Sequence, residues 1–228
     1  MSTDKVELEF SKKYDRQHAE YYLRKHRQGL ARQLSTWRDE QLARKALKIA
    51  GTPLEVLDLP CGAGRFWPML GENLQRRIIG ADNSADMIAV ACAGQPQAIV
   101  ARVTPLQTSA FAVELPDASV DCVFCMRLIH HIGKPEDRLT MLREFHRVSR
   151  DTVILSMWVD GNYKAWKRRR AEKRRHARGT APSVQNRFVI PAATIEAEFA
   201  QTGFKVIGSL DFIPHYAMWR FYVLRKDT

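Results

Sequence analysis

Between residues 54 and 158, short apolar runs typical of strands alternate with segments typical of helices. We expect strands at residues 54–59, 76–82, 97–103, 118–129 and 151–158. Helices are expected between them, at residues 65–74, 84–94 and 134–148. Parallel strands need a long crossover connection, usually a helix, so this alternation predicts a parallel sheet with helices on both faces.

The alternation of predicted strands and helices ends after Trp158. A helix is expected at residues 191–204, and strand-like runs at 205–213 and 216–226 are separated by only a few residues. Two strands so close in the chain can pair only as an antiparallel hairpin. The sequence therefore predicts an α/β fold, a Rossmann-like open sheet of five parallel strands with a C-terminal antiparallel hairpin.

Two further segments accompany this sheet. Residues 11–50 have a helical composition, with an expected break near Gly29. We therefore divide the chain into an N-terminal helical cap at residues 1–50 and a main domain at residues 51–228, with a basic helical insertion at residues 159–190.

Positive charge is concentrated in that insertion and in residues 12–48, which contain eleven Lys or Arg residues against four Asp or Glu. The chain has a net charge of +11, and residues 164–178, KAWKRRRAEKRRHAR, contain nine Lys or Arg residues and one Glu. On a helix, Arg170, Arg174 and Arg178 would share one face. The planar guanidinium suits phosphate, so we predict that this segment binds a cyclic dinucleotide, a lipid-linked sugar phosphate or RNA. The alternative is a solvated helix that only adds solubility.

The sequence gives no sign of a membrane span or of a metal site. No apolar run approaches the ~20 residues that a span requires, and the N-terminus lacks the apolar core of a signal peptide. We expect a cytoplasmic protein, with peripheral binding at the inner membrane left open. Cys122 and Cys125 form a CxxC inside a predicted strand, where their side chains would point to opposite faces. We interpret both as core residues and predict no metal site.

The turn DLPCGAGR, residues 58–65, follows the first predicted strand, where open α/β sheets bind ligands. No Lys-Ser/Thr pair follows its glycines, which excludes a P-loop. Trp67 stands where a dinucleotide fingerprint needs its third glycine. Asp58 with spaced glycines suits a ligand with a positive amine, and Asp82, ending the next strand, can accept both hydroxyls of a ribose. S-adenosylmethionine (SAM) has both groups.

In order and spacing, these motifs resemble those of the class I SAM-dependent methyltransferases over roughly residues 50–225. VLDLPCGAGR is similar to their first motif, GADNSADMI to their ribose-binding segment, and LPDASVDCVFCMRLIHHI to their fourth-strand block. The resemblance implies their seven-stranded fold and SAM as the cofactor. The implied cofactor-binding residues are Asp58, Pro60, Cys61, Gly62, Gly64, Arg65, Asp82, Asn83, Met87, Ser109, Ala110 and Met126.

Two positions, Pro60 and Ser109, depart from the family's pattern, and a third, Tyr14, is expected to cover the cofactor. Pro60 replaces the first glycine of the motif, which removes a backbone N–H from the turn but fixes its shape. Ser109 stands where the family often has an acid that reads the adenine amine. Tyr14 is expected to close a lid over the cofactor, with packing onto the sheet as the alternative.

A methyl transfer needs a base only if the acceptor must first lose a proton. His131, just past the fourth predicted strand, is the candidate base, with packing as the alternative, and we interpret His130 as a packing residue. Trp158, Asn162 and Tyr163, at or just after the end of the fifth predicted strand, are expected to line an acceptor pocket, with a hydrophobic base for the basic helix as the alternative.

The leading hypothesis is thus a SAM-dependent methyltransferase acting on a small or carbohydrate-type acceptor. A fainter resemblance, carried by the arginines and DLPCGAGRF, is to bacterial methyltransferases associated with lipopolysaccharide, some regulated by cyclic di-GMP. It implies a lipopolysaccharide-related acceptor and cyclic di-GMP at the basic segment. The alternatives are an RNA methyltransferase, or a regulatory SAM- or nucleotide-binding protein with little turnover. A protein partner is left open.

Overall fold

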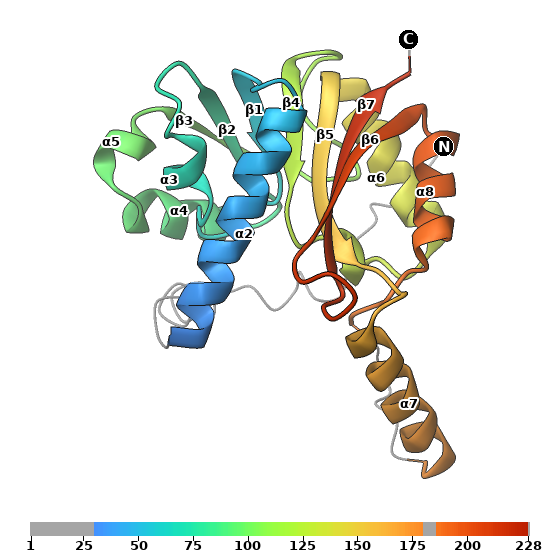
Figure 1. Cartoon of the computed structure of the whole chain (residues 1–228). Coiled ribbons are helices and arrows are strands. Elements are labelled where there is room, and N and C mark those ends of the chain that lie inside the picture. Colours follow the sequence, from blue (N-terminus) through green and yellow to red (C-terminus); the bar gives the residue numbers. More distant parts are fainter. Residues whose placement is uncertain (1–29, 180–185, 228) are drawn as a thin grey trace.

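Within residues 30–179 and 186–227, the part of the chain that this computed structural model describes, seven strands form one sheet in the order β3-β2-β1-β4-β5-β7-β6 (Figure 1). The strands are β1 (Glu55–Asp58), β2 (Arg77–Asp82), β3 (Val103–Gln107), β4 (Val120–Cys125), β5 (Ser149–Trp158), β6 (Phe204–Asp211) and β7 (Trp219–Lys226). Strands β1 to β5 pair in parallel, and β7 runs antiparallel to both β5 and β6. The predicted parallel sheet with a C-terminal hairpin is confirmed.

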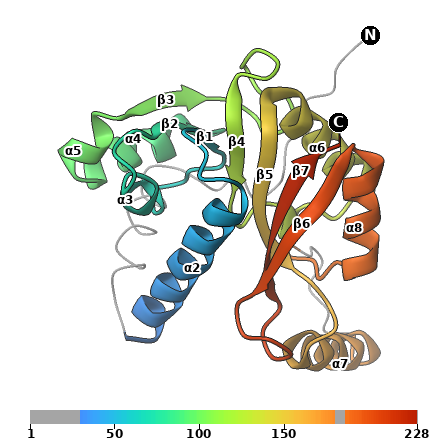
Figure 2. The same cartoon turned by 45° about the horizontal axis from the view of Figure 1, so that its top comes forward.

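Helices cover both faces of this sheet (Figures 1 and 2). They are α2 (Leu30–Ile49), α3 (Trp67–Leu70), α4 (Ala85–Gly94), α5 (Gln97–Val100), α6 (Pro135–Val148), α7 (Tyr163–Ala177) and α8 (Ala192–Gln201), with a 3₁₀ turn at Ile129–His131. One core cluster packs α2, α3 and α4 against the sheet, and the other packs α6 and α8 against its opposite face. Cys122 lies in the first cluster and Cys125 in the second, both fully buried, so the CxxC divides between the two faces as predicted.

The predicted strand at residues 97–103 is wrong. Gln97–Val100 forms the short helix α5, and the strand β3 begins only at Val103. Pro105 lies within β3, which a central strand would not tolerate because proline cannot donate a backbone hydrogen bond. β3 lies at the edge of the sheet, where proline is tolerated.

The predicted helix at residues 65–74 is reduced to the single turn α3. Its first residue, Trp67, is fully buried, and its ring occupies space that side chains would need at two glycines. A Cβ on Gly64 would lie 2.8 Å from the Trp67 ring, and a Cβ on Gly80 would lie 2.4 Å from it. The indole therefore fits at the third-glycine position because Gly80 of β2, beneath it, has no side chain.

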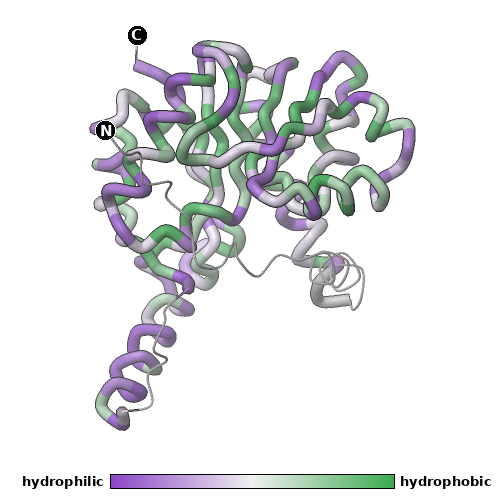
Figure 3. The backbone as a smooth tube through the Cα atoms, turned by 180° about the vertical axis from the view of Figure 1, so that it is seen from behind, coloured by the Kyte–Doolittle hydropathy of each residue, from purple (hydrophilic) through white to green (hydrophobic). Residues whose placement is uncertain are grey.

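Helix α7 stands away from the body of the molecule, attached at its N-terminal end (Figures 1 and 3). Asn162 caps it by accepting from Ala165 N at 3.0 Å, Ala165 is fully buried, and Tyr163 N donates to His215 O at 2.9 Å. Beyond this attachment its residues are mostly hydrophilic and exposed. None of the helices in the described ranges is long and apolar enough to span a membrane.

Candidate functional site

The turn after β1 is held against the end of β2 by its backbone. Cys61 N donates to Ala81 O at 2.7 Å, and Gly64 N donates to Cys61 O at 3.0 Å. Gly62 and Gly64 have φ angles of +53° and +68°, in the left-handed region that side chains disfavour. This conformation explains the glycines of the motif. The Leu59–Pro60 peptide bond is cis.

Asp82, at the end of β2, connects this turn to helix α4. Its Oδ2 accepts from Gly62 N and its Oδ1 from Ser84 N, each at 3.0 Å. Ser84 in turn caps α4 by accepting from Met87 N at 3.3 Å. Burial raises the pKa of Asp82, although the backbone hydrogen bonds oppose that shift. Each carboxylate oxygen has a second lone pair, so ribose hydroxyls can bind there without displacing the backbone donors.

Asp58, the other acid of the first motif, lies behind the turn. It is 1% exposed, and burial raises its pKa well above the usual range, although the Trp67 side chain opposes that shift. No described residue donates a hydrogen bond to its Oδ1. A buried carboxylate oxygen without a donor is costly, and a nearby cation would relieve that cost.

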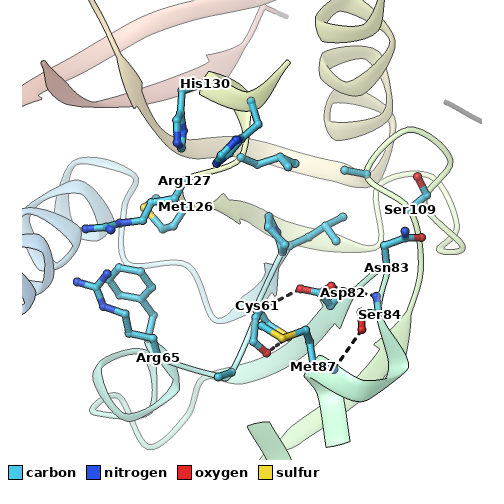
Figure 4. A pocket seen from close by; sticks show the side chains of 18 of the residues that line it. Cys61, Arg65, Asp82, Asn83, Ser84, Met87, Ser109, Met126, Arg127 and His130 are labelled. Atoms are coloured by element: carbon cyan, nitrogen blue, oxygen red, sulfur yellow. Dashed lines mark hydrogen bonds between the residues drawn. The ribbon is translucent and has the colours of Figure 1, made fainter. Parts of the chain in front are cut away.

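A cavity of about 270 Å³ opens above the turn, at the carboxyl ends of β1, β2 and β4. Figure 4 shows Asp82, Asn83, Ser84 and Ser109 on one side of it, and Arg65, Arg127 and His130 on the other. Most of the expected site residues line it: Pro60, Cys61, Gly62, Arg65, Asp82, Asn83, Met87, Ser109, Ala110, Met126, His131 and Trp158.

The remaining expected residues lie elsewhere. Asp58 and Gly64 are within the first turn but do not line the cavity. Tyr163 lies at the start of α7, half exposed, and Arg170, Arg174 and Arg178 follow along or just past that projecting helix. Tyr14 lies outside the described residues.

The sequence did not point to Arg127, which lines the same cavity. Its φ angle is +61°, its N–H donates to Ser156 Oγ at 3.0 Å, and its guanidinium stacks on Trp219 with 4.9 Å to the ring centroid. Arg127 Nη2 and Arg65 Nη2 both reach Oδ2 of Asp39, a residue of α2 that is 2% exposed. No local motif announces this cluster, because its members lie on α2 and on the turns after β1 and β4.

His130 and His131 have different environments. The ring of His130 is 3% exposed and packs on Trp158 and Trp219, with centroids 5.0 and 4.8 Å away. Burial, followed by the charges of nearby His131 and arginines, lowers its pKa to about 2. His130 thus packs as interpreted, and it also lines the cavity.

His131 is held in one tautomer. Its Nδ1 lies 2.6 Å from Asn186 O, and because a carbonyl only accepts, Nδ1 must carry the proton. Burial lowers the pKa of His131 below its usual value, despite this hydrogen bond. The ring is therefore neutral near pH 7, with Nε2 as its basic nitrogen.

Comparison with known proteins identifies a domain type and a fold. A family model described as a methyltransferase domain matches residues 56–152. The chain is 32% identical over 117 residues to a protein named tRNA U34 carboxymethyltransferase from Shewanella frigidimarina. The match covers 48% of this chain and 33% of that relative. The chain thus spans about a third of the length of this curated relative.

Solved structures share the fold at low sequence identity. Magnesium protoporphyrin IX methyltransferase from Synechocystis, with bound S-adenosylhomocysteine (SAH), superposes with a TM-score of 0.66 at 14% identity over 88% of each chain. A SAM-dependent methyltransferase from Aquifex aeolicus superposes with a TM-score of 0.64 at 17% identity, over 95% of this chain and all of the other. The chain therefore has the class I SAM-dependent methyltransferase fold and carries a methyltransferase domain, the type of domain whose cofactor is SAM.

Proposed function

We propose that the protein is a SAM-dependent methyltransferase whose cofactor binds at the glycine turn and Asp82, and whose acceptor binds beside His131 and Trp158. The observation that carries this proposal is the single cavity that joins these two groups of residues. The orphaned Oδ1 of Asp58 supports the choice of cofactor, because a cationic ligand above the turn would compensate the buried charge.

SAM supplies the electrophilic methyl group when bound. The chain's own contribution is alignment and exclusion of water, and alignment alone can lower a barrier by roughly 7–11 kcal/mol. The buried faces of Met126, Leu128 and Trp158 line the cavity and exclude solvent from it. For a hydroxyl acceptor, His131 Nε2 would take the proton, since the ring is neutral and its other nitrogen is committed to Asn186 O.

The acceptor is proposed to be a small or carbohydrate-type molecule, including a lipopolysaccharide-related one. The mostly apolar and aromatic side chains beside His131, among them Leu128, Trp158 and Trp219, suit a small organic acceptor at the reaction centre. In this proposal helix α7 is a separate regulatory site for a phosphorylated ligand such as cyclic di-GMP.

RNA is the second candidate acceptor, favoured by two observations. The exposed surface of α7 is basic, with Arg170 stacked on the half-exposed Trp166 at 4.9 Å from its ring centroid. Cations interleaved with exposed aromatic rings suit the phosphates and bases of an RNA chain. The curated relative named above is also, by its name, a tRNA-modifying protein.

A labelling experiment tests the proposed function. The purified chain is mixed with cell extract and SAM labelled in its methyl group, and the labelled product is identified by mass spectrometry after nuclease or protease treatment. We expect a labelled small molecule or saccharide. Label in RNA would select the second candidate, and no labelled product together with undetectable SAM binding by calorimetry would reject both.

Charge reversal tests the role of α7. Arg170→Glu/Arg174→Glu should abolish binding of cyclic di-GMP, or of RNA, while leaving SAM affinity unchanged. Lys134→Glu/Arg143→Glu, at the exposed N-cap residue of α6 and on its exposed surface, makes the same change of charge and serves as the control. If both double variants bind these ligands as wild type does, α7 is only a solvated helix.

A further inference from the structure

The acceptor end of the cavity is rich in arginine. Arg65, Arg127 and Arg187 line the cavity, whereas its lining carboxylate, Asp82, lies at the cofactor end. Asp39 pairs with Arg65 and Arg127 from behind, so these two guanidiniums share one carboxylate. Arg187 brings a third guanidinium to the wall of the same cavity.

Arg127 is held in place by contacts from three directions. Ser156 Oγ fixes its backbone at positive φ, Asp39 binds its guanidinium, and the face of Trp219 supports that group. A left-handed conformation is unfavourable for a non-glycine residue and persists only where the surroundings enforce it. Stacking on an indole leaves the N–H edge of a guanidinium available, in a fixed plane, for an anion.

Arg187 is positioned by a different segment. Its neighbour Asn186 binds His131 Nδ1 through its carbonyl, and the next residue, Phe188, donates its N–H to His130 O at 2.7 Å. The Arg187 guanidinium lies over Trp158, 5.7 Å from the ring centroid. The backbone thus fixes a second arginine directly beside the candidate base.

Two buried polar atoms in the same wall also lack partners. Trp158 Nε1 and His130 Nδ1 have no hydrogen-bond partner among the described residues. An indole N–H can only donate, so the group that would satisfy Trp158 is an acceptor such as an oxygen. A low pKa of His130, caused first by burial and then by these cations, agrees with the positive field.

We propose that the acceptor carries a carboxylate or phosphate group, bound between Arg127 and Arg187 and supported by Trp158 and Trp219, with its reacting atom beside His131. This assignment rests on the proposed methyltransferase function and narrows its acceptor to small anions, so a neutral saccharide is disfavoured. Asp39 is a positioning residue in this arrangement, because it acts on the acceptor only through the two arginines it holds.

Binding of small aromatic probes tests the assignment without requiring turnover. Calorimetry on the full chain saturated with SAH compares benzoate with benzyl alcohol, and phenyl phosphate with phenol. We expect each anion to bind at least tenfold more tightly than its neutral counterpart, and the better of the two anions identifies the acceptor as a carboxylate or a phosphate. Equal affinity within each pair, or no anion binding at millimolar concentration, overturns the proposal.

Single substitutions locate the binding group. Arg187→Gln should weaken anion binding at least tenfold and leave SAH affinity within twofold of wild type. Arg143→Gln makes the same change on the exposed surface of α6 and should leave both affinities unchanged. Anion binding that survives Arg187→Gln contradicts the assignment, whereas failure of wild type to bind SAH would instead reject the proposed function.

Discussion

The two ends of the cavity are built in different ways. The cofactor end consists of backbone groups, small side chains and Asp82, drawn from the short segments 58–64, 82–87 and 108–111, with Asp58 buried behind the turn. The acceptor end consists of arginine, histidine and tryptophan side chains from the turns after β1 and β4, from the end of β5, from Arg187 and from β7, and Asp39 of α2 supports two of the arginines from behind. The first end depends on local conformation, and the second depends on the topology of the whole sheet.

The largest expected effect is a loss of SAM affinity caused by a substitution at the cofactor end alone. In Gly62→Arg, a side chain must adopt a φ of +53° and project toward Met87, whose terminal methyl would be 3.5 Å from the new Cβ. We expect SAM affinity to fall by more than about 100-fold, since backbone strain and steric exclusion of the ligand combine. Calorimetry with SAM measures this, and an unchanged circular dichroism spectrum verifies the fold. Undiminished SAM affinity would contradict the cofactor assignment.

This contrast explains what the sequence could predict. The glycines, Asp58 and Asp82 lie in contiguous motifs, so their spacing pointed to the cofactor, and ten of the twelve expected contacts from that resemblance line the cavity. Asp39, Arg127 and Trp219 carry no such signal, because they meet only when β4 pairs between β1 and β5 and α2 packs on one face. The fold was predictable for a related reason, because the periodicity of strands and helices is a local property of the sequence. The predicted strand at residues 97–103 was wrong because the observed strand, β3, lies further along the chain and contains Pro105, which an edge position tolerates.

The next effect separates chemistry from cofactor binding. His131→Ala should lower turnover of a hydroxyl acceptor by about 100-fold or more, since a general base typically contributes 10²–10⁴. SAH affinity should stay within a few-fold of wild type. Because the pKa of His131 is lowered, the wild-type rate should rise with pH only below about 6.5 and then reach a plateau. Steady-state kinetics check this, with His176→Ala on exposed α7 as the control, and equal rates for wild type and His131→Ala would assign His131 to packing.

A pair of acid substitutions, one at each end, sharpens the comparison further. Asp82→Ala removes the acceptor of two backbone N–H groups and of the ribose hydroxyls, so we expect SAM affinity to fall by about tenfold to 100-fold. Asp39→Asn loosens Arg65 and Arg127 instead, and should weaken benzoate or phenyl phosphate binding by a few-fold while sparing SAM. Calorimetry on both variants measures the two ligands in turn. Loss of SAM affinity in both would show that the two ends are not independent.

The smallest expected effect concerns stability. Substitutions of buried residues usually lower the melting temperature, whereas Asp58→Asn is expected to raise it. Asp58 is buried, its Oδ1 has no donor among the described residues, and burial raises its pKa well above the unfolded value of about 3.9. The folded state therefore binds a proton more tightly than the unfolded state. The stability contributed by Asp58 is complete at low pH and is lost as pH rises through its folded pKa. Asp58→Asn removes the buried charge at nearly constant shape. We expect the ligand-free variant to melt a few degrees above wild type at pH 8, with the gain shrinking toward pH 4, while SAM affinity falls.

Asp121 supplies the matched control of opposite sign. Although partial burial acts to raise its pKa, hydrogen bonds from Glu55 N at 2.9 Å and from Arg150 hold that pKa below the usual range. Its contribution is present at neutral pH and is lost as pH falls below about 4 through the lowered folded pKa, so Asp121→Asn should lower the melting temperature at pH 8 and have a progressively smaller effect in acid. Thermal melts of both variants across this pH range test the pair. If Asp58→Asn lowers the melting temperature at pH 8 as Asp121→Asn does, then Asp58 stabilises the ligand-free fold, and its buried carboxyl is not a destabilising group retained for ligand binding.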